Sequence, residues 1–270
     1  MVFTKKLCAA ARVTAHHPRR HKSPTCAQQP NIRAKSKLAQ TNRSNIPTAT
    51  KVDHSDAYNQ QMKEAMGWKD ADPYQYHYDR GLYYHEIVPD LICGSQPRHA
   101  QDITELKEEV RASTIINLQQ DADFNHWGVD FGALQHRAQE LDIQLIRRPA
   151  QDFDPHSLRH MLPSAVSSVH HSLEKKRRVY VHCTAGLGRA PAVIIAYLFW
   201  FRDMGLDEAY KHLTDIRPCG PKRDAIRGAT FDLCSGRPPH EFDQLDSNAF
   251  SGMSQHERDT LRHRVVTWGS

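Results

Sequence analysis

The first 50 residues of the chain contain no aspartate or glutamate. They hold ten lysines and arginines among scattered serine, threonine, alanine and proline, which is the composition of a transit peptide. The alternative interpretation is a disordered basic tail that binds an acidic partner. The whole chain has a net charge of +5 and this segment contributes +10, so residues 51–270 carry −5. The net positive charge of the chain therefore does not indicate nucleic-acid binding. We therefore expect residues 1–55 to be a transit peptide or disordered.

Long apolar runs and paired cysteines are also missing. The longest apolar run, residues 193–201, is too short to cross a bilayer. The six cysteines show neither the spacing of a disulfide framework nor the Cys-x-x-Cys pairs of a zinc site. The sequence thus predicts no membrane span, no metal site, no cofactor and a reducing compartment.

Beyond the acid-free segment, strand and helix patterns alternate, which favours an α/β fold with a central sheet flanked by helices. We expect a catalytic domain over residues 74–234. A helical pattern follows the Pro238-Pro239 break, and residues 235–270 are too short for a core of their own, so they should pack on that domain. The predicted strands are 83–88, 91–94, 114–118, 143–147 and 179–182, and the predicted helices are 100–109, 131–141, 155–174, 188–203, 206–215 and 221–234.

The strongest motif begins where an apolar strand ends in His182 and Cys183. A glycine-bearing loop follows, and Arg189 stands six residues after the cysteine at the start of a helix. Backbone amides of such a loop converge on an anion, and together with the helix N-terminus and the arginine they favour a thiolate. The loop residues predicted to bind phosphate are Thr184, Ala185, Gly186, Leu187, Gly188 and Arg189.

This arrangement predicts a cysteine-dependent phosphatase in which Cys183 is the nucleophile and Arg189 holds two phosphoryl oxygens. The alternative is that Cys183 is simply a small buried apolar residue, the default for a lone cysteine. Strand, spacing, glycines, arginine and helix all agree with the catalytic interpretation. The residue after the arginine is Ala190, which lacks the hydroxyl that dual-specificity phosphatases usually carry there; Thr184 is the nearby candidate to supply one.

A general acid is needed as well, and in the dual-specificity phosphatase family, which this motif resembles, it lies on a loop about 30 residues before the cysteine. Asp152 and Asp154 both occupy that loop. Asp154 directly precedes Pro155 and suits the N-cap of a helix, so Asp152 is the preferred acid. It would protonate the leaving oxygen and then activate the hydrolytic water.

Several motifs in order resemble the plant glucan phosphatases from about Tyr74 to the C-terminus. The short interval between Leu233 and Phe250 leaves no room for a carbohydrate-binding module, so the chain is more similar to the Like Sex Four Two type. That resemblance implies removal of phosphate from amylopectin and maltooligosaccharides, at the C3 position in that type, by a monomer in the plastid, in the chloroplast stroma at the starch granule surface. The motifs are Asn117–Asp121, Trp127-Gly128, Arg148–Ala150, Asp152–Asp154, His182–Pro191, Arg217–Pro221 and Ala225–Thr230.

The same resemblance implies a channel of aromatic side chains that bind glucan, formed by Tyr74, Tyr76, Trp127 and Phe153. For any one ring, packing in the core is the simpler explanation, since aromatic rings bury the largest areas. Phe250 and Glu257 match a secondary glucan site of the type, whereas His171 replaces a tryptophan of another. Two alternative functions stay open: a phosphatase acting on phosphoproteins, and a non-catalytic scaffold that binds glucan.

Overall fold

A five-stranded sheet lies at the centre of the structure, a computed structural model that describes residues 49–67 and 75–268. The strand order is β1-β2-β5-β3-β4. β1 and β2 are antiparallel, and the other neighbouring pairs are parallel. The strands are β1 (Tyr84–Val88), β2 (Leu91–Gly94), β3 (Thr114–Asn117), β4 (Gln144–Arg147) and β5 (Val179–His182).

The sequence of β5 explains its central place. All four of its residues are buried, as expected for a parallel strand covered on both faces. Successive side chains point to opposite faces, so Val179 and Val181 join one apolar cluster and Tyr180 joins the other. The neighbouring β3 divides Ile116 and Ile115 in the same way.

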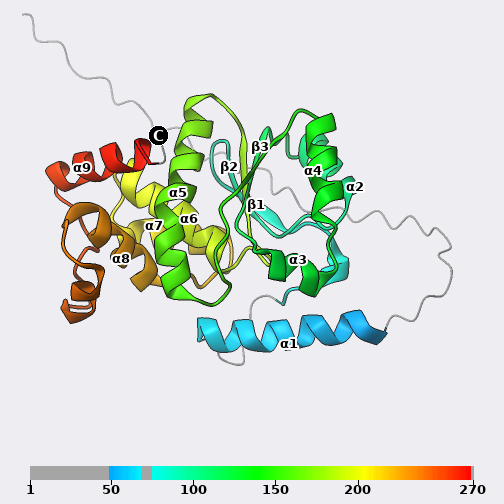
Figure 1. The fold of residues 1–270 in the computed structure, drawn as a ribbon, viewed down its shortest axis with the longest axis horizontal. Coiled ribbons are helices and arrows are strands. Elements are labelled where there is room, and N and C mark those ends of the chain that lie inside the picture. The colour runs from blue at the N-terminus through cyan, green and yellow to red at the C-terminus, as the bar shows by residue number, and fades with distance from the viewer. Residues whose placement is uncertain (1–48, 68–74, 269–270) are drawn as a thin grey trace, which may run out of the picture. The chain divides into compact units, whose positions relative to one another are not determined.

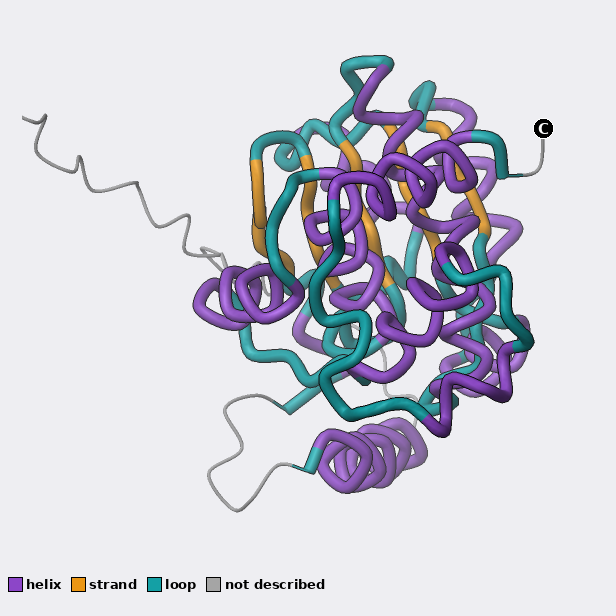
Figure 2. The backbone as a smooth tube through the Cα atoms, turned by 90° about the vertical axis from the view of Figure 1, so that its left-hand side faces the viewer, coloured by secondary structure: helices purple, strands orange, loops and turns teal. Residues whose placement is uncertain are grey.

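Helices cover both faces of this sheet (Figures 1 and 2). The apolar side chains of one group of helices join the cluster that contains Val181, and those of a second group join the cluster that contains Tyr180. The first group is α5 (Pro155–Glu174), α6 (Arg189–Phe201), α7 (Leu206–Ile216), α8 (Arg223–Cys234) and α9 (Gln255–Val266), and the second is α2 (Ala100–Glu108), α3 (Asp121–Trp127) and α4 (Phe131–Glu140).

The predicted elements agree closely with these. All five strands begin and end within one residue of their predicted limits, α5 matches at both ends, and the α/β architecture is confirmed. The apolar run at residues 193–201 forms most of α6, a helix that is almost wholly buried. The sequence analysis missed α3, a short helix that begins at Asp121. It also missed the 3-10 turns at Tyr78–Arg80 and Pro239–Gln244.

An N-terminal helix, α1 (Ala49–Met66), was likewise not predicted. It begins before residue 55, where we expected the N-terminal segment to end. Its only basic residue in the last turn is Lys63, and its first turn holds no acidic residue. In Figure 1 it lies along the lower edge of the domain, next to α3.

The C-terminal segment contacts the end of α6. Arg258 donates a hydrogen bond to the carbonyl of Phe199, and Arg262 donates one to the carbonyl of Trp200 (2.7 Å). These arginines satisfy carbonyl groups that the last turn of a helix leaves without partners. No helix in the described part of the chain is both long and apolar enough to span a membrane.

Candidate active site

The candidate site lies at the carboxyl ends of three parallel strands. β5 leads into Cys183, β3 into the segment before α3, and β4 into the loop that carries Asp152. Asn117 of β3 pairs in register with His182 of β5 and with Arg147 of β4, so the three loops leave the sheet at the same level. This edge is where open α/β sheets ordinarily place their ligands.

The loop after β5 is fixed by contacts that point away from its centre. The carbonyl of Thr184 accepts a hydrogen bond from the backbone of Gln96 (2.9 Å), and that of Leu187 accepts one from Gly220 (3.0 Å). Gly186 has a φ of 71°, and a β-carbon there would collide with the carbonyl of Gly94. Only glycine fits this turn.

With those carbonyls turned outward, the amides of the loop are left for a ligand. Within the described residues, no group accepts a hydrogen bond from the amides of Ala185, Gly186, Leu187 or Gly188. They lie between the end of β5 and the first turn of α6, whose N-terminus also carries a partial positive charge. This is the geometry of an anion-binding loop, as the sequence predicted.

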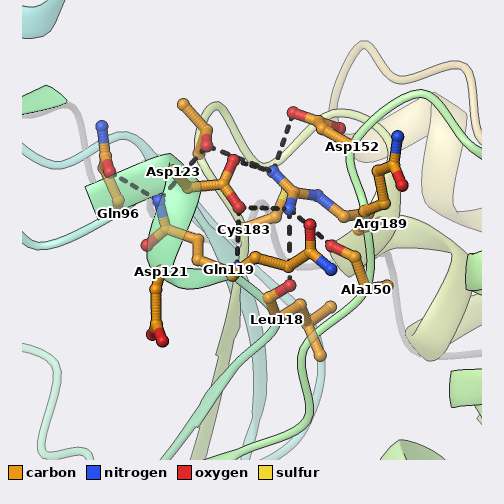
Figure 3. Close-up of polar contacts among 12 residues, drawn as sticks. Gln96, Leu118, Gln119, Asp121, Asp123, Ala150, Asp152, Cys183 and Arg189 are labelled. Atoms are coloured by element: carbon orange, nitrogen blue, oxygen red, sulfur yellow. Dashed lines mark hydrogen bonds and ion pairs between the residues drawn. The ribbon is translucent and has the colours of Figure 1, made fainter. Parts of the chain in front are cut away.

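Arg189 is buried and held from several sides (Figure 3). Its Nη1 donates to the carbonyl of Ala150 and to Asp123 Oδ2, each at 2.9 Å. Its Nη2 donates to Asp152 Oδ2 at 2.7 Å and to Thr184 Oγ1 at 3.2 Å. The guanidinium therefore spans the space between the cysteine loop and the loop of the proposed acid.

The charge state of Arg189 is set by its neighbours. Burial alone would lower its pKa, but Asp152, the sulfur of Cys183 and Asp123 raise it above the ordinary value. The side chain thus stays cationic beside the cysteine. The structure brings Cys183, Arg189 and Asp152 together, three residues that the sequence analysis assigned to catalysis.

His182 and three of the other described cysteines are neutral at neutral pH. Burial lowers the pKa of His182 to about 4, and its Nδ1 lies 3.1 Å from the carbonyl of Cys183. Burial also raises the pKa of Cys93 and Cys219 to about 12 and that of Cys234 to about 11. These three thiols are therefore poor nucleophiles.

The two acidic candidates on the loop after β4 have different partners. Asp154 Oδ1 accepts the backbone amides of His156 (2.8 Å) and Ser157 (3.2 Å), so it is the N-cap of α5, as expected. Asp152 instead faces Arg189. Its Oδ2 also accepts a hydrogen bond from the hydroxyl of Tyr58 on α1 (3.1 Å), and its Oδ1 accepts one from the backbone amide of Phe153 (3.1 Å).

Asp123 belongs to the same network, and the sequence analysis did not identify it. Its two carboxylate oxygens accept hydrogen bonds from Nη1 (2.9 Å) and Nη2 (3.2 Å) of Arg189. It also accepts the backbone amide of Gln120 at the start of α3. The available signal was an acidic residue in the first turn of a helix at the carboxyl end of a strand, but its partner lies far away in sequence. Asp123 positions the guanidinium that would hold the phosphoryl group.

We expect Asp123→Asn to lower kcat/KM for para-nitrophenyl phosphate by about tenfold to a hundredfold, because it weakens two charge-assisted hydrogen bonds to Arg189. Asp121→Asn is the matched control, since Asp121 is exposed and pairs with Arg147. The control should change kcat/KM less than about threefold. Equal effects of the two substitutions would refute a positioning role for Asp123.

The hydroxyl question raised by Ala190 has a structural counterpart. Ala190 is fully buried in the apolar cluster beneath the loop, and its side chain has no hydroxyl. Thr184 is buried too, and its Oγ1 accepts from Gln119 Nε2 as well as from Arg189 Nη2, each at 3.2 Å. One contact links Thr184 to Arg189 and the other to Gln119, so the hydroxyl of Thr184 helps to hold the guanidinium.

Three of the four predicted glucan-binding aromatics lie close to the site, and the fourth, Tyr74, is outside the described residues. Tyr76 and Trp127 contact each other edge to face, with ring centroids 5.2 Å apart. They are 2% and 6% exposed, so both rings are covered in this structure. Phe153 is only partly buried, beside Asp152.

The structure does not bring Phe250 and Glu257 into this cluster. Phe250 packs edge-on against Phe231 of α8, with centroids 5.4 Å apart. Glu257 binds Ser254 through a capping box at the start of α9. Both residues lie in the C-terminal segment, away from the aromatic cluster. The carboxylate of Glu257 accepts hydrogen bonds from Ser254, so it has a structural role there.

Comparison with known proteins agrees with this geometry. The catalytic domain of the dual-specificity phosphatases matches residues 91–226, half of the chain and all of the sheet after β1. The chain belongs to the dual-specificity phosphatase family. The matched residues include Cys183, Arg189 and Asp152.

Relatives of this dual-specificity phosphatase include two plant proteins. Phosphoglucan phosphatase DSP4, amyloplastic, of Castanea sativa is 41% identical over 184 residues, which cover 67% of this chain and 48% of the relative. Phosphoglucan phosphatase LSF1, chloroplastic, of Arabidopsis thaliana is 34% identical over 158 residues, 58% of this chain and 27% of the relative. The chain thus spans less than half the length of either. The crystal structure of PTPMT1 has a TM-score of 0.46 and 18% identity, covering 53% of this chain and 89% of that one.

Proposed function

We propose that this chain hydrolyses phosphate monoesters on starch glucans. The observation that carries the proposal is Phe153. It directly follows the proposed acid and has a φ of 61°, a conformation that is strained for a residue with a side chain. Such strain costs on the order of 1–3 kcal/mol and gathers at functional sites. A ring held there, in a cavity wall that also includes Asp152 and Arg189, suits a sugar face.

The similarity to two phosphoglucan phosphatases supports the same substrate class. Both names also refer to plastids, and the first 50 residues have the composition of a transit peptide. We infer that the protein acts in the plastid stroma at the granule surface. By the resemblance to the Like Sex Four Two type, it would prefer the C3 phosphate of the glucosyl unit and act as a monomer.

In the proposed mechanism, Cys183 Sγ attacks phosphorus while the loop amides and Arg189 hold the phosphoryl oxygens. The bond between phosphorus and the sugar oxygen breaks, and Asp152 donates a proton to that oxygen. Asp152 then takes a proton from water, whose oxygen attacks the cysteinyl phosphate. The S–P bond breaks, and inorganic phosphate and the Cys183 thiolate are released.

The test is phosphate release from solubilised amylopectin, labelled separately at C3 or C6, compared with release from a phosphotyrosyl peptide of equal concentration. Glucan phosphatase activity requires a higher kcat/KM on amylopectin, and the two labels report the position. A higher value on the peptide would favour a protein phosphatase. No turnover of either substrate would favour the glucan-binding scaffold.

Phe153→Ala should lower kcat/KM on amylopectin by about tenfold and change that on para-nitrophenyl phosphate less than about threefold, since only the glucan needs the ring. Phe131→Ala is the control: Phe131 stacks on Phe124, with centroids 4.8 Å apart, within the α3 and α4 region. Its effect should be the same on both substrates. Equal losses on both substrates for Phe153→Ala would remove the case for a sugar platform.

A further inference from the structure

Helix α1 lies across the candidate site, and nothing in the proposed chemistry uses it. Its Tyr58 lies between three aromatic neighbours: the ring centroid is 5.4 Å from that of Trp127 and 5.7 Å from those of Tyr76 and Phe153. The latter three rings are those expected to bind glucan. Tyr58 thus occupies the space that a sugar unit would need.

The polar end of Tyr58 reaches the catalytic groups. Its hydroxyl donates to Asp152 Oδ2 at 3.1 Å. Burial raises the pKa of Tyr58 well above its ordinary value, and the charges of Asp152 and Cys183 raise it further, so the phenol keeps its proton. A leaving sugar oxygen would have to approach the same carboxylate, so Tyr58 and substrate compete for Asp152.

The C-terminal end of α1 covers the phosphate-binding loop. Met66 lies against Gly188, at the start of α6, and against Gly220. Lys222 donates a hydrogen bond to the carbonyl of Ala65 in the last turn of α1. A cation at this end of a helix is favourable because the last carbonyls carry partial negative charge.

The space left between α1 and the site is small. The cavity bounded by Ala65, Met66, Asp152, Phe153, Gly188 and Arg189 has a volume of about 30 Å³. That is roughly the share of one water molecule in the liquid, whereas sites for organic ligands are ordinarily about 300–1,000 Å³. A glucosyl phosphate does not fit while α1 is docked.

The attachment of α1 includes a specific pair of hydrogen bonds. The side-chain amide of Asn59 pairs with the backbone of Tyr76 through two hydrogen bonds, of 2.8 and 2.7 Å. Among the residues of the helix whose side chains are described, Met62 is the fully buried apolar one. Ser55 and Asn59, the other buried residues of its described face, are polar. Beside Met62, the apolar contacts of the described part of α1 come from the half-buried Tyr58 and Met66, and an element with so few buried apolar residues is among those that detach at low cost in free energy.

We propose that α1 is an intramolecular plug, which excludes substrate from the active site until a glucan chain displaces Tyr58 from the aromatic rings. In the docked state phosphate esters do not reach Cys183. In the undocked state Tyr76, Trp127 and Phe153 are uncovered for sugar. The identity of the displacing ligand rests on the proposed function, whereas the exclusion itself rests on contacts within the chain.

The first test uses the full chain and no glucan. Asn59→Ala removes both hydrogen bonds to Tyr76 and lies outside the catalytic groups. We expect the rate of Cys183 carbamidomethylation by iodoacetamide and kcat/KM for para-nitrophenyl phosphate to rise together by about fivefold or more, since each lost bond changes the docking equilibrium by at least about twofold. The matched control is Gln60→Ala, an exposed amide on the same helix. It should leave both rates unchanged.

Met66→Lys is the second variant, since it places a positive charge near Lys222 and Arg189 and should also raise both rates. Circular dichroism and thermal unfolding would verify that the variants fold. Rates within twofold of the parent for both substitutions would overturn the plug. So would a fall in kcat/KM, because it would make α1 a working part of the site.

The second test uses the unaltered chain with maltohexaose and hydrogen exchange. The plug predicts faster exchange of the amides of residues 59–66 and slower exchange around Trp127 when the sugar is added. Slower exchange in both regions would make α1 a wall of the glucan site and refute displacement. No change in either region would count against glucan binding, and the plug itself would still be decided by the aryl phosphate measurement.

Discussion

Replacing Cys183 with serine should lower phosphate release from amylopectin on the order of 10⁴-fold or more and leave glucan binding unchanged. A serine hydroxyl is a far weaker nucleophile than a thiolate, and a site that loses its nucleophile retains only the contribution of binding and of the oxyanion-stabilising groups. The side chain at position 183 is only 2% exposed and is not one of the aromatic residues proposed to bind glucan. Steady-state kinetics and calorimetric titration with maltohexaose would measure the two effects.

Cys219→Ser is the matched control. Cys219 is buried like Cys183, and its raised pKa keeps it a neutral thiol. This variant should retain activity within a few-fold. A fully active Cys183→Ser protein would contradict the covalent mechanism outright.

Asp152→Ala should reduce kcat on amylopectin by roughly 10²–10⁴-fold at neutral pH. The departing sugar alkoxide is a poor leaving group and needs the proton that Asp152 supplies. Para-nitrophenolate leaves without that help, so the loss on para-nitrophenyl phosphate should be much smaller. Because the substitution also breaks the Tyr58 hydrogen bond that helps to dock α1, a decrease in rate cannot be attributed to tighter closure.

Asp154→Ala tests whether the general acid is Asp152 or the neighbouring helix cap, Asp154. It removes two hydrogen bonds at the N-terminus of α5 and should cost about 1 kcal/mol in the free energy of unfolding. Its kcat on amylopectin should stay close to that of the parent. If Asp154→Ala showed the larger loss on amylopectin and Asp152→Ala the smaller, the two aspartates would have to exchange roles.

The phosphate-binding loop could be predicted because its sequence signals are local, although Gln96 and Gly220 also hold it in the fold. The strand, the glycines, Arg189 and the helix that follows lie within one short segment, and the positive φ of Gly186 follows from the loop itself. The caps of α5 were readable for the same reason, as Asp154 and Pro155 are adjacent.

The features that were missed depend on the tertiary fold. Asp123 pairs with an arginine 66 residues away, and only the parallel order of β3, β4 and β5 brings them together. Helix α1 has a largely polar sequence without a strong apolar stripe, so periodicity did not reveal it. Its position over the site is fixed by Tyr58 and Asn59, whose partners lie in other elements.

The burial of Tyr76 and Trp127 also depends on the tertiary fold and could not be predicted from the sequence. A sequence motif identifies which rings stand near a site, but the side that they present depends on what covers them. Trp127 also stacks on Tyr78, with centroids 5.6 Å apart, so one part of the ring has a packing role in any case. Under the plug proposal, Tyr76 and Trp127 are packed as core residues while α1 is docked. The same rings line the glucan channel when α1 is displaced.

The place of β5 in the sheet bears on how the chain reaches its native state. β5 is inserted between β2 and β3, and both of these precede it in sequence. Until β5 pairs with β2 and β3, these two strands are not joined in one sheet. The pairing of β5 with β2 closes a long loop of the chain, and such non-local contacts slow folding. Cys183, at the end of this strand, therefore acquires its surroundings late, once β5 has paired with β2 and β3.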